Sequence, residues 1–235
     1  MEVRVRHRDD LGRERLVSAA VLRGTPVEEW PVLNEQRPYK GRKSKVSRWW
    51  SSTTKKDILC RSKEHAFAAM FLDRDPDIAY LGAASLQLEY GVGEGKVVVE
   101  PAFLARTVGG QRVFYFYSPA WREPDEQEWA VARAAADDAG WEVRAAYAPA
   151  GQLRRNVYIV SQFRHDEYPD EAAKGALLEV FARPRSAGEG ADAAGLPPGQ
   201  GRARCWHLLW TGALTCDWER PLTPDSMVWA VQEAR

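Results

Sequence analysis

The chain has 235 residues, of which 45% are hydrophobic and 28% charged, and its formal net charge at pH 7 is zero. This balance is typical of a folded globular protein and excludes a long disordered chain. Zero net charge also excludes attraction of the whole molecule to DNA phosphates, so nucleic-acid binding would require an uneven distribution of charge. The length suffices for one α/β core and a smaller module.

The three cysteines, Cys60, Cys205 and Cys216, lie far apart in the sequence. Their number and spacing fit neither a disulfide framework nor a metal site made of closely spaced thiolates. The first residues lack the apolar stretch of a signal peptide, and no segment approaches the roughly 20 apolar residues of a membrane span. We therefore expect reduced thiols, a cytoplasmic protein and no membrane partner.

Residues 1–60 are predicted to form a basic extension with short strands. Val3 and Val5 alternate with polar residues, and the apolar run 16–22 ends at Gly24, which is a turn signal. Residues 35–56 are polar and basic and predict an ordered loop. Its candidate DNA-binding residues are Lys40, Arg42, Lys43, Lys45, Arg48, Trp49 and Trp50. A solvated charged face, and for the tryptophans a place in the core, are the alternative interpretations.

Residues 61–165 carry the pattern of an α/β core. Ser62 is a suitable N-cap for an apolar helical pattern over 63–73, and the aromatic run 113–117 is typical of a central strand buried on both faces. The remaining predicted elements are a meander of strands at 78–81, 86–90, 96–99 and 102–106, a helix at 124–139 and a strand at 141–146. Residues 156–160 are predicted to form a further strand or to begin an apolar segment. This order predicts a mixed sheet flanked by helices.

Residues 166–235 are predicted to form a small C-terminal module. Residues 170–182 favour a helix, and the apolar segments 205–214 and 221–231 favour a further helix and a small hairpin. Between them, residues 184–203 are rich in Ala, Gly and Pro and poor in large apolar side chains, which predicts a flexible linker.

Several motifs resemble one known family. Glu64-x-x-Phe67 is followed by the aspartate-rich turn 72–78, and collinear matches follow up to His207-Leu-Leu-Trp-x-Gly-x-Leu214 and Asp217. Over about residues 35–230 this set is similar to TnsA-like endonuclease subunits of heteromeric transposases, of actinobacterial type. The resemblance implies a restriction-endonuclease-like, PD-(D/E)XK core at 61–165 and a winged-helix-like C-terminal module that engages DNA or a partner protein.

The resemblance also implies that the active site is degenerate. The resemblance implies that active members use a glutamate, an aspartate in a Pro-Asp turn and a polar-x-Lys or Asp-x-Arg step on the next strand around divalent metal. Glu64 matches the glutamate, whereas Ala102 stands at the aspartate position and Phe116 and Ser118 stand at the step. A methyl group cannot bind metal, and one glutamate makes a poor Mg²⁺ site.

A displaced ligand set is the alternative to a lost site. Glu100 lies two residues before Ala102 and would share its strand face, so Glu64 and Glu100 are the candidate metal ligands, with Glu89 as a further acid. No cofactor is expected for a degenerate site, whereas an active one would need Mg²⁺ or Mn²⁺.

Three functions follow as hypotheses. The first is a catalytically degenerate subunit that binds DNA, a DDE-type transposase or a helix-turn-helix protein, in a mobile-element or DNA-defence setting. The second is an active metal-dependent DNA endonuclease with relocated ligands. The third is a regulatory interaction protein that does not bind DNA, which the zero net charge favours.

Overall fold

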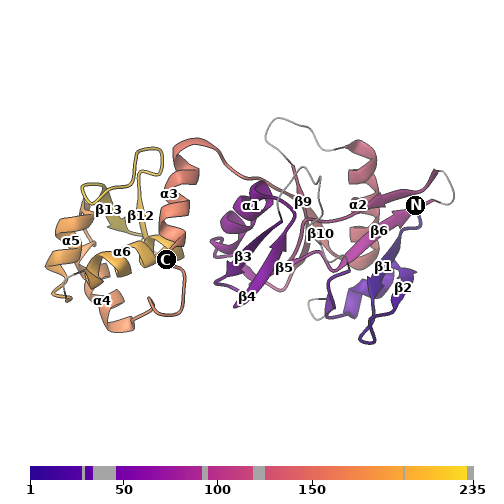
Figure 1. Ribbon diagram of the computed structural model, residues 1–235, viewed down its shortest axis with the longest axis horizontal. Helices are drawn as coiled ribbons and strands as arrows, with labels where there is room; N and C mark the ends of the chain where they lie inside the picture. Colours follow the sequence, from indigo (N-terminus) through magenta and orange to yellow (C-terminus); the bar gives the residue numbers. More distant parts are fainter. Residues whose placement is uncertain (28–29, 34–45, 92–94, 119–124, 198, 232–235) are drawn as a thin grey trace. The chain divides into compact units, whose positions relative to one another are not determined.

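The computed structural model describes residues 1–27, 30–33, 46–91, 95–118, 125–197 and 199–231 (Figure 1). The chain is a mixed α/β protein with two compact units, Met1–Ala148 (unit 1) and Pro149–Arg235 (unit 2). Residues 1–60 fall within unit 1, and the two units meet in sequence between residues 148 and 149. None of the described helices is long and apolar enough to cross a lipid bilayer.

The central sheet of unit 1 is mixed, as the sequence predicts. Its strand order is β10-β9-β8-β5, with β9 and β10 parallel and the other pairs antiparallel. The strands are β5 (Ile78–Ala83), β8 (Phe103–Thr107), β9 (Arg112–Tyr117) and β10 (Glu142–Ala146). Helix α2 (Glu126–Ala139) makes the crossover that a parallel pair requires.

A second sheet of unit 1 has the order β2-β1-β6-β7 and is antiparallel. It contains β1 (Arg4–Arg8), β2 (Glu14–Ser18), β6 (Leu86–Tyr90) and β7 (Val97–Val99). The predicted meander is therefore wrong, because β5 pairs with β8 while β6 and β7 join the N-terminal strands. Alternating apolar residues indicate a strand but do not specify its partner.

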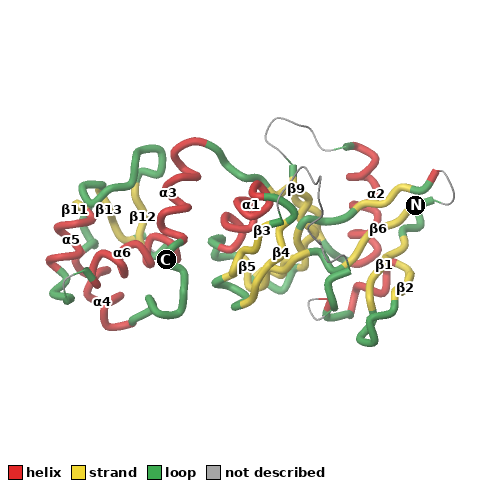
Figure 2. Tube along the Cα trace, in the orientation of Figure 1, coloured by secondary structure: helices red, strands yellow, loops and turns green. Residues whose placement is uncertain are grey.

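Helix α2 lies between the two sheets (Figures 1 and 2). Its buried face is made of alanines and Val131, which lets both sheets approach closely. Asp125 caps the helix by accepting hydrogen bonds from the amides of Gln127 and Glu128, and Gly140 ends it with a φ of 71°. The 3-10 helix η1 (Ala19–Gly24) packs on the same core, where Ala19 and Leu22 are fully buried.

A hairpin of β3 (Ser47–Ser51) and β4 (Lys56–Cys60) replaces part of the predicted basic loop. It packs on helix α1 (Lys63–Asp73), which Ser62 caps as predicted. The carboxylate of Asp73, the last residue of α1, is buried and accepts five hydrogen bonds from the hairpin. The donors are Trp49 Nε1, Ser51 Oγ, the Ser52 amide and Oγ, and the Thr53 amide.

In its described residues, unit 2 combines four helices with a small antiparallel sheet of order β11-β13-β12 (Figure 2). Its helices are α3 (Gly151–Ser161), α4 (Glu171–Val180), α5 (Ala187–Ala193) and α6 (Gln200–Thr211). Its strands are β11 (Arg185–Ser186), β12 (Leu214–Cys216) and β13 (Met227–Ala230).

Two predictions for unit 2 are wrong. The predicted strand 156–160 lies in α3, where Asn156, Val157 and Val160 are buried at helical spacing. The predicted linker 184–203 forms β11, α5 and the start of α6. Small residues allow these elements to pack. Gly190 lies so close to Phe181 that a Cβ on it would be 2.3 Å from the Phe181 ring, so a larger residue would not fit. The composition predicted a flexible linker because glycine and alanine offer little apolar side-chain area to bury. These residues instead contribute to a core by letting neighbouring segments approach closely.

Candidate functional site

A cavity of about 390 Å³ lies in unit 1 at the end of the central sheet, where β8 begins and β9 ends. Backbone hydrogen bonds fix its floor: the Ala102 amide donates to Tyr115 O (2.7 Å), and the Ser118 amide donates to Ala146 O (3.1 Å). The lining residues are Arg61, His65, Val98, Val99, Glu100, Ala102, Phe116, Tyr117, Ser118, Glu128 and Trp129.

The cavity brings together most of the site positions singled out in the sequence. Ala102, Phe116 and Ser118 all line it, as does Glu100. The lining residue from the first turn of α1 is His65, next to the predicted Glu64. Residues that are distant in sequence are therefore neighbours in space, while Glu64 is not among the lining residues.

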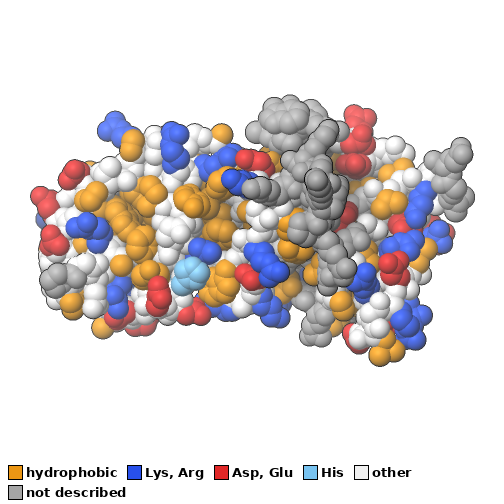
Figure 3. Space-filling model, viewed as in Figure 1, with side chains coloured by type: hydrophobic (Ala, Val, Ile, Leu, Met, Phe, Trp, Pro, Cys, Tyr) orange, Lys and Arg blue, Asp and Glu red, His pale blue; other side chains and the backbone are white. Residues whose placement is uncertain are grey.

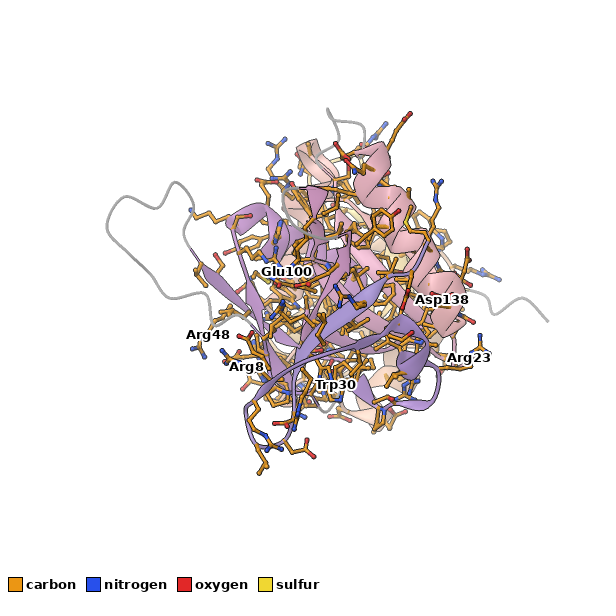
Figure 4. The ribbon with its side chains drawn as sticks, turned by 90° about the vertical axis from the view of Figure 1, so that its right-hand side faces the viewer. Arg8, Arg23, Trp30, Arg48, Glu100 and Asp138 are labelled. Carbon is orange, nitrogen blue, oxygen red and sulfur yellow. The ribbon has the colours of Figure 1, made fainter. Side chains whose placement is uncertain are left out.

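An ion pair occupies the polar side of the cavity. Arg61 pairs with Glu100 and also approaches Pro101 O at 3.5 Å. The side chains are 30% and 17% exposed, so the pair is shielded from bulk water. Glu100 points into the body of the unit in Figure 4. The carboxylate that sequence reasoning proposed as a displaced metal ligand is thus neutralised by a guanidinium.

His65 contributes an uncharged ring to the cavity wall. Its ring centroid lies 4.5 Å from that of Tyr117 and 6.3 Å from that of Phe103. Burial, together with the smaller effect of the neighbouring Arg61, lowers the pKa of His65 to about 4. The imidazole is therefore neutral at pH 7.

This histidine should make the stability of unit 1 depend on pH. The unfolded chain binds a proton on His65 below its ordinary pKa of 6.5, whereas the folded chain binds it only near 4. The contribution to stability is therefore complete above pH 6.5 and is lost as the pH falls to about 4, by up to about 3 kcal/mol. Urea unfolding of wild type and His65→Phe between pH 6.5 and about 4 checks this loss of stability. Parallel pH profiles for the two proteins would contradict the expectation.

The donor set of the cavity does not fit a divalent metal ion. Its two carboxylates are Glu100, which Arg61 holds, and Glu128 on α2. Mg²⁺ requires several oxygen ligands in octahedral geometry, and a guanidinium beside them repels it. Across the described parts of the chain, no three His, Cys, Asp or Glu side chains are grouped as a metal site would require.

Glu89 is also unsuited to binding metal. It is 3% exposed and lies in the β2-β1-β6-β7 sheet, paired with Arg6 at 2.5 Å and Lys96 at 2.8 Å. Burial raises its pKa, but the hydrogen bonds from Arg6 and Lys96 outweigh burial, and the pKa lies below its usual value. The Glu89 carboxylate is therefore buried and held by two cations.

The candidate DNA-binding residues divide into three groups. Lys40, Arg42, Lys43 and Lys45 lie outside the described residues. Arg48 is on β3 with its side chain 73% exposed, and Trp50 lies on the same strand face, partly exposed. Trp49 is 7% exposed and donates its indole N–H to Asp73 at 3.0 Å. A direct contact between Trp49 and DNA would require the ring to leave the core.

Sequence reasoning missed seven lining residues: Arg61, His65, Val98, Val99, Tyr117, Glu128 and Trp129. His65 lies in the first turn of α1, whereas Arg61 precedes the Ser62 cap, so helix periodicity does not relate the two residues. Glu128 and Trp129 reach the cavity only because α2 packs between the sheets.

Comparison with known proteins adds no relative. No protein-family model matches the sequence, and a search of curated proteins finds no significant match.

Proposed function

We propose that this chain is a non-catalytic relative of TnsA-like endonuclease subunits that binds DNA beside a partner protein. The order α1, β5, β8, β9, α2, β10 around a mixed sheet is the arrangement expected of an endonuclease-like core, with β6 and β7 as an insertion. In unit 2, helices α4, α5 and α6 with a sheet of order β11-β13-β12 support a winged-helix-like module.

The observation that carries this proposal is the content of the cavity. Where hydrolysis would need carboxylates and a lysine around metal, the lining offers a methyl group at Ala102, an aromatic ring at Phe116 and a hydroxyl at Ser118. The Arg61–Glu100 pair takes the place of a charged, hydrated centre. Such a lining can bind and position groups, but it does not activate water at a phosphodiester.

Two surfaces support binding. Basic side chains lie over the region of the β3–β4 hairpin on the face shown in Figure 3. On unit 2, partly exposed apolar side chains include Tyr158 and Ile159 of α3 and Met227 of β13. Exposed apolar side chains of this size are common at protein–protein interfaces. The first surface suits DNA and the second suits a protein such as a DDE-type transposase or a helix-turn-helix protein.

Plasmid cleavage tests the loss of catalysis. Supercoiled plasmid incubated with the purified protein and Mg²⁺ or Mn²⁺ is expected to remain intact. A variant combining Ala102→Asp, Ser118→Lys and Arg61→Ser restores oxygen ligands and removes the repelling guanidinium, so it should bind Mn²⁺ in calorimetry where wild type does not. Nicking by wild type that Glu64→Ala abolishes would instead show a surviving endonuclease.

Salt-dependent DNA binding tests the other half of the proposal. We expect Arg48→Glu to weaken binding to duplex DNA severalfold at low salt and to lower the slope of log K against log salt by about one or two. The matched control is Arg23→Glu, since Arg23 lies on the opposite side of the view in Figure 4. Equal effects of the two reversals, measured by fluorescence anisotropy, would exclude the hairpin as a DNA-binding surface.

A further inference from the structure

The outer face of the β3–β4 hairpin combines an aromatic ring with cations on a rigid support. Neighbouring residues of a strand point to opposite faces, so burial of Trp49 and Ser51 against α1 places Arg48 and Trp50 on the outer face. Lys55, in the turn, lies over the Trp50 ring at 5.4 Å from its centroid. We call Arg48, Trp50 and Lys55 the hairpin platform.

We propose that the hairpin platform takes an unpaired nucleotide of DNA, whose base displaces the Lys55 ammonium from the Trp50 ring and stacks there, with its phosphate beside Arg48 or the displaced Lys55. This inference rests on the proposed DNA binding and names the form of DNA involved. Aromatic rings on an exposed strand face next to basic side chains are the usual means of holding single strands, because every base offers a flat face. In a duplex, both faces of each base are already stacked.

The charges of the platform favour stacking over a purely electrostatic contact. A guanidinium nitrogen of Arg48 lies 3.6 Å from a carboxylate oxygen of Asp57, whose side chain is 51% exposed. Asp57 is on β4, directly opposite Trp50 in the hairpin. Asp57 therefore offsets part of the positive charge of Arg48. Affinity for a phosphate backbone alone falls quickly with salt, whereas stacking on an aromatic ring persists.

The support beneath the platform is fixed before any ligand arrives. The turn 51–54 is held by the Asp73 carboxylate, and Thr54 Oγ1 donates to Leu81 O at 2.6 Å, which ties the hairpin to β5. Lys55 follows in the left-handed region with a φ of 57°, and its amide donates to Ser51 O at 2.9 Å. A ring held on such a support loses little freedom when a base stacks on it.

The test compares a fluorescein-labelled 12-nucleotide single strand with the matching blunt duplex by anisotropy, using the full chain. Trp50→Ala is expected to weaken single-strand binding about tenfold or more, while Trp50→Phe retains most of it. Duplex binding should change less than twofold in both variants. Thermal unfolding of each variant confirms that the hairpin still folds.

The outcomes separate this inference from the proposed function. Duplex binding that persists, together with single-strand binding that ignores Trp50→Ala, overturns the platform and leaves DNA binding in place. Equal losses for single strand and duplex also overturn it. If wild type binds neither form at low salt, both the platform and the proposed DNA binding fail.

Discussion

Replacing Asp73 by asparagine is expected to lower the free energy of unfolding of unit 1 by about 3 kcal/mol or more. The two carboxylate oxygens share the five donors of the hairpin, and each oxygen accepts one backbone amide, from Thr53 at Oδ1 and from Ser52 at Oδ2. Whichever way the asparagine amide turns, its NH₂ group therefore faces a buried backbone N–H. Such a conflict costs the desolvation of both groups, which exceeds the loss of one ordinary hydrogen bond.

Urea unfolding followed by circular dichroism checks this expectation, with Asp77→Asn as the control. Asp77 lies four residues further along the chain and is exposed, so its substitution should change stability by less than about 0.5 kcal/mol. Similar stabilities for the two variants would mean that the hairpin is not held by Asp73. In that case the rigid support beneath the hairpin platform would also be lost.

Gly201→Ala is expected to destabilise unit 2 by about 2 kcal/mol or more, against the ordinary preference of helices for alanine. Gly201 is buried in the first turn of α6, where an added Cβ would lie 2.6 Å from the carbonyl oxygen of Ala191. The atom in the way belongs to backbone, so relief requires α5 and α6 to move apart.

The matched control is Gly175→Ala on α4, where a Cβ meets nothing within 4 Å. That substitution should stabilise the helix by up to about 1 kcal/mol, because it removes conformational freedom from the unfolded chain. Thermal unfolding measures both changes. If Gly201→Ala destabilises the protein while Gly175→Ala stabilises it, the segment around α5 is packed against α6. If Gly201→Ala is neutral or stabilising, the contact between α5 and α6 does not exist.

Elements with a strong local signal could be predicted from the sequence. Helix α1 begins after its Ser62 cap and ends at Asp73 as expected, and the aromatic run of β9 lies at the centre of its sheet. What the sequence did not reveal depends on contacts between distant segments. The partners of β6, the helical state of residues 156–160 and the order of 184–203 are all decided by packing, which local propensity does not encode.

The candidate site likewise contains residues that the sequence identified and residues whose role only the structure revealed. Ala102, Phe116 and Ser118 could be aligned in sequence, and the structure places them around one cavity. Arg61 could not be assigned a role in advance, because its pairing with Glu100 joins residues 39 positions apart. The adjacent Trp49 and Trp50 looked equivalent in sequence, whereas strand alternation gives one to the core and leaves the other partly exposed.

The pairing of β1 with β6 also limits how the chain can be shortened. A fragment that begins at residue 61 retains the whole central sheet with α1 and α2, yet it lacks β1, the strand that lies between β2 and β6. Leu86 and Leu88, now packed with Val3 and Val5, would lose that cover, and β6 would present an open edge. We expect such a fragment to aggregate when expressed, so the first 60 residues are part of the smallest piece of unit 1 that can be studied in solution.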